Sequence, residues 1–263
     1  MPSEFTVERA SFVSHGLGLP GFPVGTEESS EVGDHIMGVA VIGWLTHHPV
    51  SRWGEAWASC VSLDVRFRAQ LTEGLPLTTT VMGDDRSIEF CVADERQVYC
   101  TGSATRSSDA AARSLRRAEV ASRPGKVTPD ADALRDRTFP AMSFEFDAAR
   151  DLAFVRHLAD GATWRDRGWA HPAWLASATN ALLRRSIDFG DPGTWLNAGM
   201  SIRQHAPIVD GATIILAGGI DELFERGRHS FAVAGITAWA NGEPAASLRN
   251  TFVYASNDEA SAR

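Results

Sequence analysis

One pattern of residues occurs twice in this sequence, and it restricts the fold more than any other feature. In each occurrence a stretch suited to a helix is followed by several stretches suited to strands, with glycine-containing turns between them. The helix starts lie at His35 and His171, an offset of 136 residues, and the turn glycines Gly74 and Gly211 are 137 residues apart. A shared order of elements at a nearly constant offset indicates two copies of one structural unit.

Both predicted helices are indicated by their apolar residues. Residues 36–46, IMGVAVIGWLT, are apolar almost throughout and are followed by Pro49, a pattern typical of a buried helix that ends before a proline. In the second copy, HPAWLASATNALLRRSI begins at His171 and has apolar residues at helical spacing, with Pro172 suited to the first turn. We therefore expect one long helix in the core of each copy.

Stretches of alternating apolar residues follow each helix and predict an antiparallel meander. Turn sequences that contain Gly, Asp or Asn separate these stretches. Strands are expected over 56–69, 75–83, 87–93 and 98–105 in the first copy, and over 142–146, 195–204, 212–223, 229–240 and 245–255 in the second.

The composition changes between the two copies. From Ser107 to about Pro140 the chain is rich in Ala, Arg, Asp, Ser and Pro, which is typical of a linker, and residues 109–121 suit a short helix. We therefore expect an N-terminal unit over residues 1–108, a linker over 109–140 and a C-terminal unit over 141–263.

Charge and composition argue against several classes of protein. The chain of 263 residues has a net charge of −8, which disfavours a nucleic-acid partner, because phosphate binding needs clustered cations. Neither a membrane-spanning apolar stretch nor a signal-peptide pattern is found. The spacing of Cys60, Cys91 and Cys100 fits neither a zinc site nor a disulfide framework, so we expect reduced thiols and a cytoplasmic location.

Two passages resemble the hot-dog families of acyl-thioester enzymes. Residues 63–106, which begin LDVRFRAQLTEGLPL, resemble a thioesterase-like pattern in which a strand leads through a glycine turn into a hairpin, and WLASATNALL is similar to the helix of these families. The resemblance covers nearly the whole chain outside the linker. It implies an α+β fold, a tandem double hot-dog in which an antiparallel sheet wraps a long central helix in each copy, as in double hot-dog acyl-CoA thioesterases and MaoC-like hydratases.

The resemblance also implies candidate catalytic residues on the two helices. The families carry an acidic residue nine positions after the His or Gly at the helix start, where this sequence has Asn180, and Trp44 in the first copy. This is a departure, because an amide does not accept a proton from water. His171 and His35 are candidate bases, since unpaired amides at a helix start suit a carbonyl and imidazole titrates near neutral pH. A capping role for His171 and a structural role for Asn180 are the alternatives.

Other residues are candidates for binding the substrate or its carrier. Trp174 belongs to a group of tryptophans close to His171, which indicates either core packing or an acyl pocket, so the second copy is expected to keep the better site. Asn250 is the nearest match to a glutamine that positions water in the related thioesterases. Arg226 and Arg228 lie in a predicted turn and are candidates for binding the phosphates of coenzyme A, with a solvated turn as the alternative.

Three functions stay open at this stage. The first is a thioesterase acting on an acyl-CoA or acyl carrier protein conjugate, the second is a hydratase, dehydratase or isomerase on the same scaffold, and the third is a non-catalytic acyl-binding protein. Metal-ligand spacing and a phosphate-binding loop are both missing, so we expect no metal and no cofactor. The expected partner is an acyl thioester, and we expect neither a nucleic acid nor a membrane as a partner. The sequence leaves open whether the protein forms a homodimer.

Overall fold

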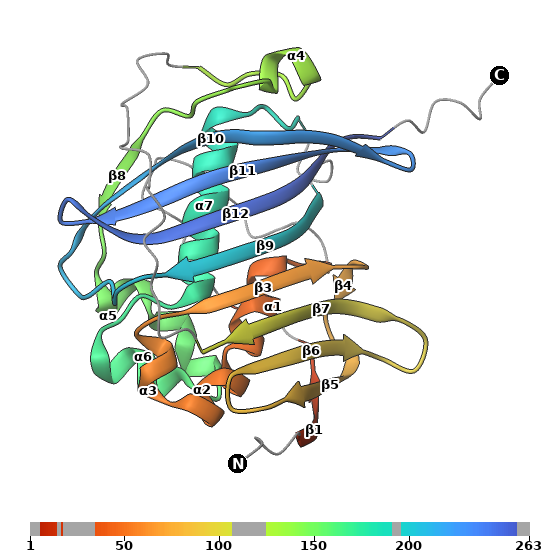
Figure 1. Cartoon of the computed structure of the whole chain (residues 1–263), viewed down its shortest axis with the longest axis vertical. Helices are drawn as coiled ribbons and strands as arrows, with labels where there is room; N and C mark the ends of the chain where they lie inside the picture. Colours follow the sequence, from red (N-terminus) through yellow and green to blue (C-terminus); the bar gives the residue numbers. More distant parts are fainter. Residues whose placement is uncertain (1–5, 15–16, 18–34, 107–124, 191–195, 257–263) are drawn as a thin grey trace.

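The computed structural model describes residues 6–14, 17, 35–106, 125–190 and 196–256. Within these residues ten strands form one antiparallel sheet, and most of the helices lie against one face of it (Figure 1). The fold class is therefore α+β, as expected from the sequence. No helix in the described part of the chain is both long and apolar enough to cross a membrane.

The first half of the chain supplies one side of the sheet. Its strands, read from the outer edge to the centre, are β1 (Thr6–Val13), β5 (Pro76–Gly83), β6 (Ser87–Ala93), β7 (Val98–Thr105) and β3 (Ser62–Phe67). Two short strands, β2 (His35–Ile36) and β4 (Leu71–Thr72), form a separate antiparallel pair.

The second half supplies the other side of the sheet. Its strands, again read from the outer edge to the centre, are β8 (Met142–Glu145), β10 (Thr213–Arg226), β11 (His229–Ala240), β12 (Glu243–Ser256) and β9 (Leu196–Gln204). In each half the strand at the outer edge of the sheet comes early in the chain. The next three strands of the sheet form a meander, and the strand at the centre precedes that meander in the chain. The turn glycines Gly74 and Gly211 both adopt a positive φ, 81° and 76°, which explains why glycine occupies both positions.

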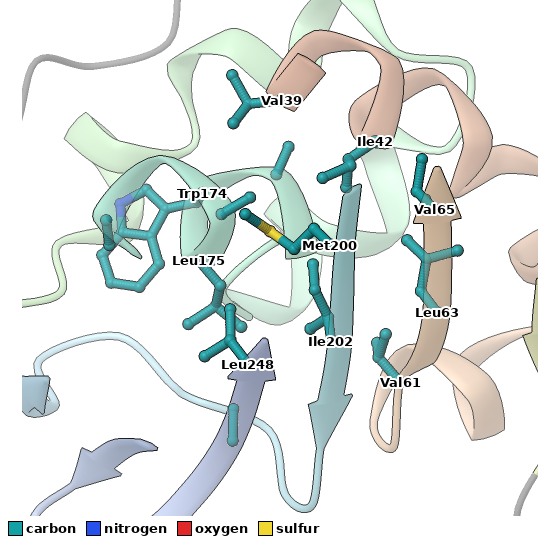
Figure 2. Close-up of a cluster of buried hydrophobic side chains, with 14 of the residues drawn as sticks. Val39, Ile42, Val61, Leu63, Val65, Trp174, Leu175, Met200, Ile202 and Leu248 are labelled. Carbon is teal, nitrogen blue, oxygen red and sulfur yellow. The ribbon is translucent and has the colours of Figure 1, made fainter. Parts of the chain in front are cut away.

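The two halves meet at the centre of the sheet. There β3 pairs with β9, so that Leu63 lies opposite Ile202 and Val65 lies opposite Met200. The helices α1 (Gly38–Leu45) and α7 (Pro172–Ser186) lie against this seam and contact each other. Figure 2 shows side chains of both helices, such as Ile42 and Leu175, gathered over strands of both halves. One apolar core is therefore shared by the two halves.

The segment after α1 differs from the expectation. The chain continues into α2 (His47–Trp53) and α3 (Glu55–Ala58), so the strand predicted over 56–69 begins only at Ser62. Pro49 does not end the helical region but lies in the first turn of α2, where a proline removes no helical hydrogen bond. The apolar residues that suggested a strand, including Trp57 and Ala58, are buried helical residues.

Helices that were not predicted lie between β8 and α7. They are α5 (Ala148–Asp151), the 3-10 helix η1 (Ala153–His157) and α6 (Gly161–Arg167). Glycine is required at position 161, because a Cβ there would lie 1.9 Å from the carbonyl oxygen of Val155. In the expected linker, α4 (Ala131–Leu134) is capped by Asp130. The helix predicted over 109–121 lies outside the described residues.

Candidate functional site

A cleft of about 410 Å³ opens where the two halves meet. It is bounded by the start of α1, the loop between β3 and β4, the second half of α7 and parts of β9, β11 and β12. Its walls are largely apolar, with Val41, Phe67 and Leu71 from the first half and Phe231 and Val253 from the second. Apolar walls with a few polar groups are typical of a site for a small organic ligand.

The start of α1 forms one side of the cleft. Met37 is the N-cap residue, and no side chain caps the helix there. The first backbone N–H groups of a helix have no partner within the helix, and they carry partial positive charge. Gly38 lines the cleft, where a Cβ atom would lie 2.7 Å from the ring of Phe67. The backbone N–H groups at this end of α1 are therefore candidate donors to a ligand carbonyl oxygen.

Asn180 lines the same cleft from α7. Its Oδ1 accepts a hydrogen bond of 2.9 Å from Nδ2 of Asn250 on β12. Asn250 is fully buried and does not belong to the cleft lining, so it supports Asn180 from behind rather than contacting a ligand as predicted. With Oδ1 accepting from Asn250, the NH₂ group of Asn180 can serve as a donor to a ligand in the cleft.

His171 lies in the core and not in the cleft, with its side chain 0% exposed. It is the N-cap residue of α7, where Nδ1 accepts a hydrogen bond of 3.0 Å from the backbone N–H of Ala173. The ring proton then resides on Nε2, which donates to Oγ1 of Thr46 at 3.1 Å, while the Thr46 hydroxyl donates to the carbonyl oxygen of Gly43. Both ring nitrogens are therefore occupied within the protein.

Aromatic rings and a buried carboxylate enclose His171. The ring centroids of Trp164 and Phe154 lie 4.7 and 5.4 Å from that of His171, and Oδ2 of Asp160 lies 4.0 Å from Nε2. Burial lowers the pKa of His171 to about 4, although the negative charge of Asp160 acts in the opposite direction. This geometry supports the capping and packing alternative for His171 over the catalytic one.

The other predicted site residues do not come together. Trp174 is fully buried and packs edge-on against Phe146, and Trp164 is fully buried as well, so these two tryptophans belong to the core and not to an acyl pocket. Arg226 and Arg228 are exposed at the β10–β11 hairpin, outside the cleft lining.

The cleft lies at the start of the first helix, not the second. The backbone of His35 belongs to β2 and directly precedes Ile36, which lines the cleft, while the side chain of His35 lies outside the described residues. This placement differs from the expectation that the second copy holds the better site. The second copy instead contributes Asn180 to a cleft that begins at the first helix.

Two arginines of the cleft were missed in the sequence. Arg184 follows Asn180 by one helical turn on α7, and Arg68 follows the end of β3. The spacing of four residues from Asn180 was a signal for Arg184, because such residues share one face of a helix. Among the described residues, no group of three or more His, Cys, Asp or Glu side chains is arranged to hold a metal ion.

Comparison with known proteins identifies the fold. An acyl-ACP thioesterase from Bacteroides thetaiotaomicron VPI-5482 has a TM-score of 0.54 at 11% sequence identity, over 94% of this chain and 97% of that chain. GphF dehydratase 1 has a TM-score of 0.52 at 15% identity over 97% of each chain, and a MaoC-like dehydratase 0.50 at 17% over 74% of each. No family model and no curated protein matches the sequence. The chain has the hot-dog fold, as the resemblance implied.

Proposed function

We propose that this chain is a tandem double hot-dog enzyme that hydrolyses acyl thioesters. Residues 1–108 and 141–263 form its two units, and residues 109–140 connect them. The strand order that recurs in the two halves of the sheet supports this division. The fold is shared with an acyl-ACP thioesterase, which supports an acyl thioester as the substrate class.

The arrangement of donors across the cleft carries the proposal. The start of α1, at Gly38, and the amide of Asn180 reach the same cleft from the two halves of the chain. A thioester carbonyl oxygen bound between them accepts hydrogen bonds from both, and the bonds strengthen as negative charge develops on that oxygen. Water then forms a bond to the carbonyl carbon, the carbon–sulfur bond breaks, and the leaving thiolate takes the proton that water loses.

A panel of acyl thioesters tests the proposal directly. The protein is expected to release free thiol from acyl-CoA or acyl carrier protein conjugates, since the apolar walls hold an acyl group beside the donors. The assay follows thiol release with short, long and aromatic acyl groups on both carriers. Silence across the panel, with the protein shown to be folded, would contradict hydrolysis.

A hydratase or dehydratase is the second candidate, and one observation favours it. None of the described residues that line the cleft is a carboxylate able to deprotonate water, whereas His35 directly precedes the cleft residue Ile36. In this reading His35 moves a proton beside the thioester carbonyl. The dehydratases among the structures with the same fold are consistent with this chemistry.

Substitution of His35 separates the second candidate from the first. If the protein hydrates enoyl thioesters, the loss of enoyl-CoA absorbance is expected to disappear in His35→Ala, because the proton carrier is removed. His157→Ala, at an exposed histidine, is the matched control and should keep the wild-type rate. An unchanged hydration rate in His35→Ala would exclude this role.

A further inference from the structure

The cleft includes basic side chains that a neutral acyl group does not require. Arg68 and Arg184 both line it, and none of the described lining residues is acidic. The chain as a whole has the opposite balance, with 33 acidic and 25 basic residues. Guanidinium groups beside apolar walls favour a ligand that is apolar over most of its length and anionic at one point.

Arg184 stands at a defined place relative to Asn180. Residues four apart on an α-helix lie on one face, about 6 Å apart along the helix axis. A ligand whose thioester carbonyl binds Asn180 therefore has Arg184 beside a part of its chain only a few bonds away. A guanidinium has five N–H donors, so it can bind a ligand carboxylate and keep a contact with the protein.

The anion lies either on the carrier or on the acyl group. The phosphate of the carrier is separated from the thioester by the whole pantetheine arm, which is much longer than one helical turn. A carboxylate at the end of a short acyl chain is at the distance that Arg184 requires. Arg68 is the more exposed of the two arginines, and it does not lie on the helix that carries Asn180.

We propose that Arg184 is a specificity-determining residue that binds a carboxylate at the far end of the acyl group. The preferred substrates are then thioesters of short dicarboxylic acids. This inference rests on the proposed function, because that function assigns the thioester carbonyl to Asn180. The carboxylate forms charge-assisted hydrogen bonds with the guanidinium in a setting largely shielded by apolar side chains.

Two thioesters that differ only in this carboxylate provide the test. Glutaryl-CoA and valeryl-CoA have acyl chains of the same length and the same carrier, so any difference in kcat/KM reports the terminal carboxylate. We expect glutaryl-CoA to be preferred by about tenfold or more, in line with a charge-assisted hydrogen bond. In Arg184→Gln the preference is expected to disappear, because kcat/KM falls for glutaryl-CoA alone.

Matched variants distinguish the effect of Arg184 from the effect of removing any nearby positive charge. Arg185→Gln removes an exposed arginine that is adjacent in sequence and does not line the cleft, and it should keep the preference. Arg68→Gln is expected to leave the ratio of the two kcat/KM values unchanged. Thermal melting of each variant shows that it is folded.

The outcomes distinguish this inference from the function on which it rests. Equal kcat/KM for the two thioesters in the wild-type protein overturns the inference and leaves hydrolysis standing. If neither thioester is hydrolysed, their dissociation constants are measured by calorimetry. Tighter binding of glutaryl-CoA that is lost in Arg184→Gln then supports the carboxylate site, and equal binding or no binding of either thioester overturns it.

Discussion

Replacement of Asn180 by alanine is expected to lower kcat/KM for an acyl thioester by about 100-fold, which is the usual cost of losing one donor to a developing oxyanion. Asn180 is held by a hydrogen bond from Asn250 and presents its NH₂ group as the remaining donor. Without it, the carbonyl oxygen keeps only the backbone N–H groups at the start of α1. Steady-state kinetics on the best thioester of the panel measure the change, which is expected in kcat more than in KM.

The control for this substitution is a polar residue outside the cleft. Gln97 is exposed between β6 and β7 and does not line the cleft, so Gln97→Ala should change kcat/KM by no more than about threefold. Asn180→Ala also leaves the buried amide of Asn250 unpaired, which costs about 1–3 kcal/mol of stability. Urea unfolding shows whether the variant is still folded in the assay. Wild-type kinetics in a folded Asn180→Ala protein would contradict the role of the amide.

The architecture was largely predictable because local patterns determine it. The strands over 87–93, 98–105 and 229–240 agree with β6, β7 and β11, and the helix that begins after His171 agrees with α7. In these segments the alternation of apolar residues and the glycine turns act within a few residues of one another. The segment around Trp57 was predicted as a strand because short buried helices and strands share the same apolar composition, and the helix around Trp164 was not predicted at all.

The cleft was less predictable because it depends on contacts between distant parts of the chain. Asn180 was identified by its position on the helix, but its approach to Gly38 requires the pairing of β3 with β9. His171 and Trp174 have the residue types of a site, and only burial distinguishes a site from a core. The Asn180–Asn250 hydrogen bond likewise depends on where β12 lies in the sheet.

The buried imidazole of His171 is expected to make the protein less stable as the pH falls. In the folded protein burial lowers the pKa of His171 to about 4, against 6.5 for an unperturbed histidine. Between these two values the unfolded chain binds a proton that the folded protein does not, so protonation favours unfolding. The contribution is fully present above pH 6.5, is lost as the pH falls toward 4, and amounts to roughly 3 kcal/mol.

Replacement of His171 by asparagine isolates this contribution. Asparagine is a favourable N-cap residue and does not titrate, so it can accept the hydrogen bond from Ala173 at every pH. His48, whose pKa burial also lowers to about 4, titrates in both proteins and cancels in the difference. Free energies of unfolding in urea, measured from pH 7.5 to 4.5, should therefore fall less steeply in His171→Asn than in the wild-type protein.

The difference in stability between the two proteins is expected to depend on pH. At pH 7.5 the variant should be less stable, because asparagine lacks the ring that packs against Trp164 and Phe154. Toward pH 4.5 this difference should shrink, since only the wild-type protein loses the contribution of a neutral imidazole. His157→Asn, at an exposed histidine, should follow the wild-type slope. Parallel curves for His171→Asn and the wild-type protein would mean that His171 is not held neutral in the core, and would return it to the candidates for proton transfer.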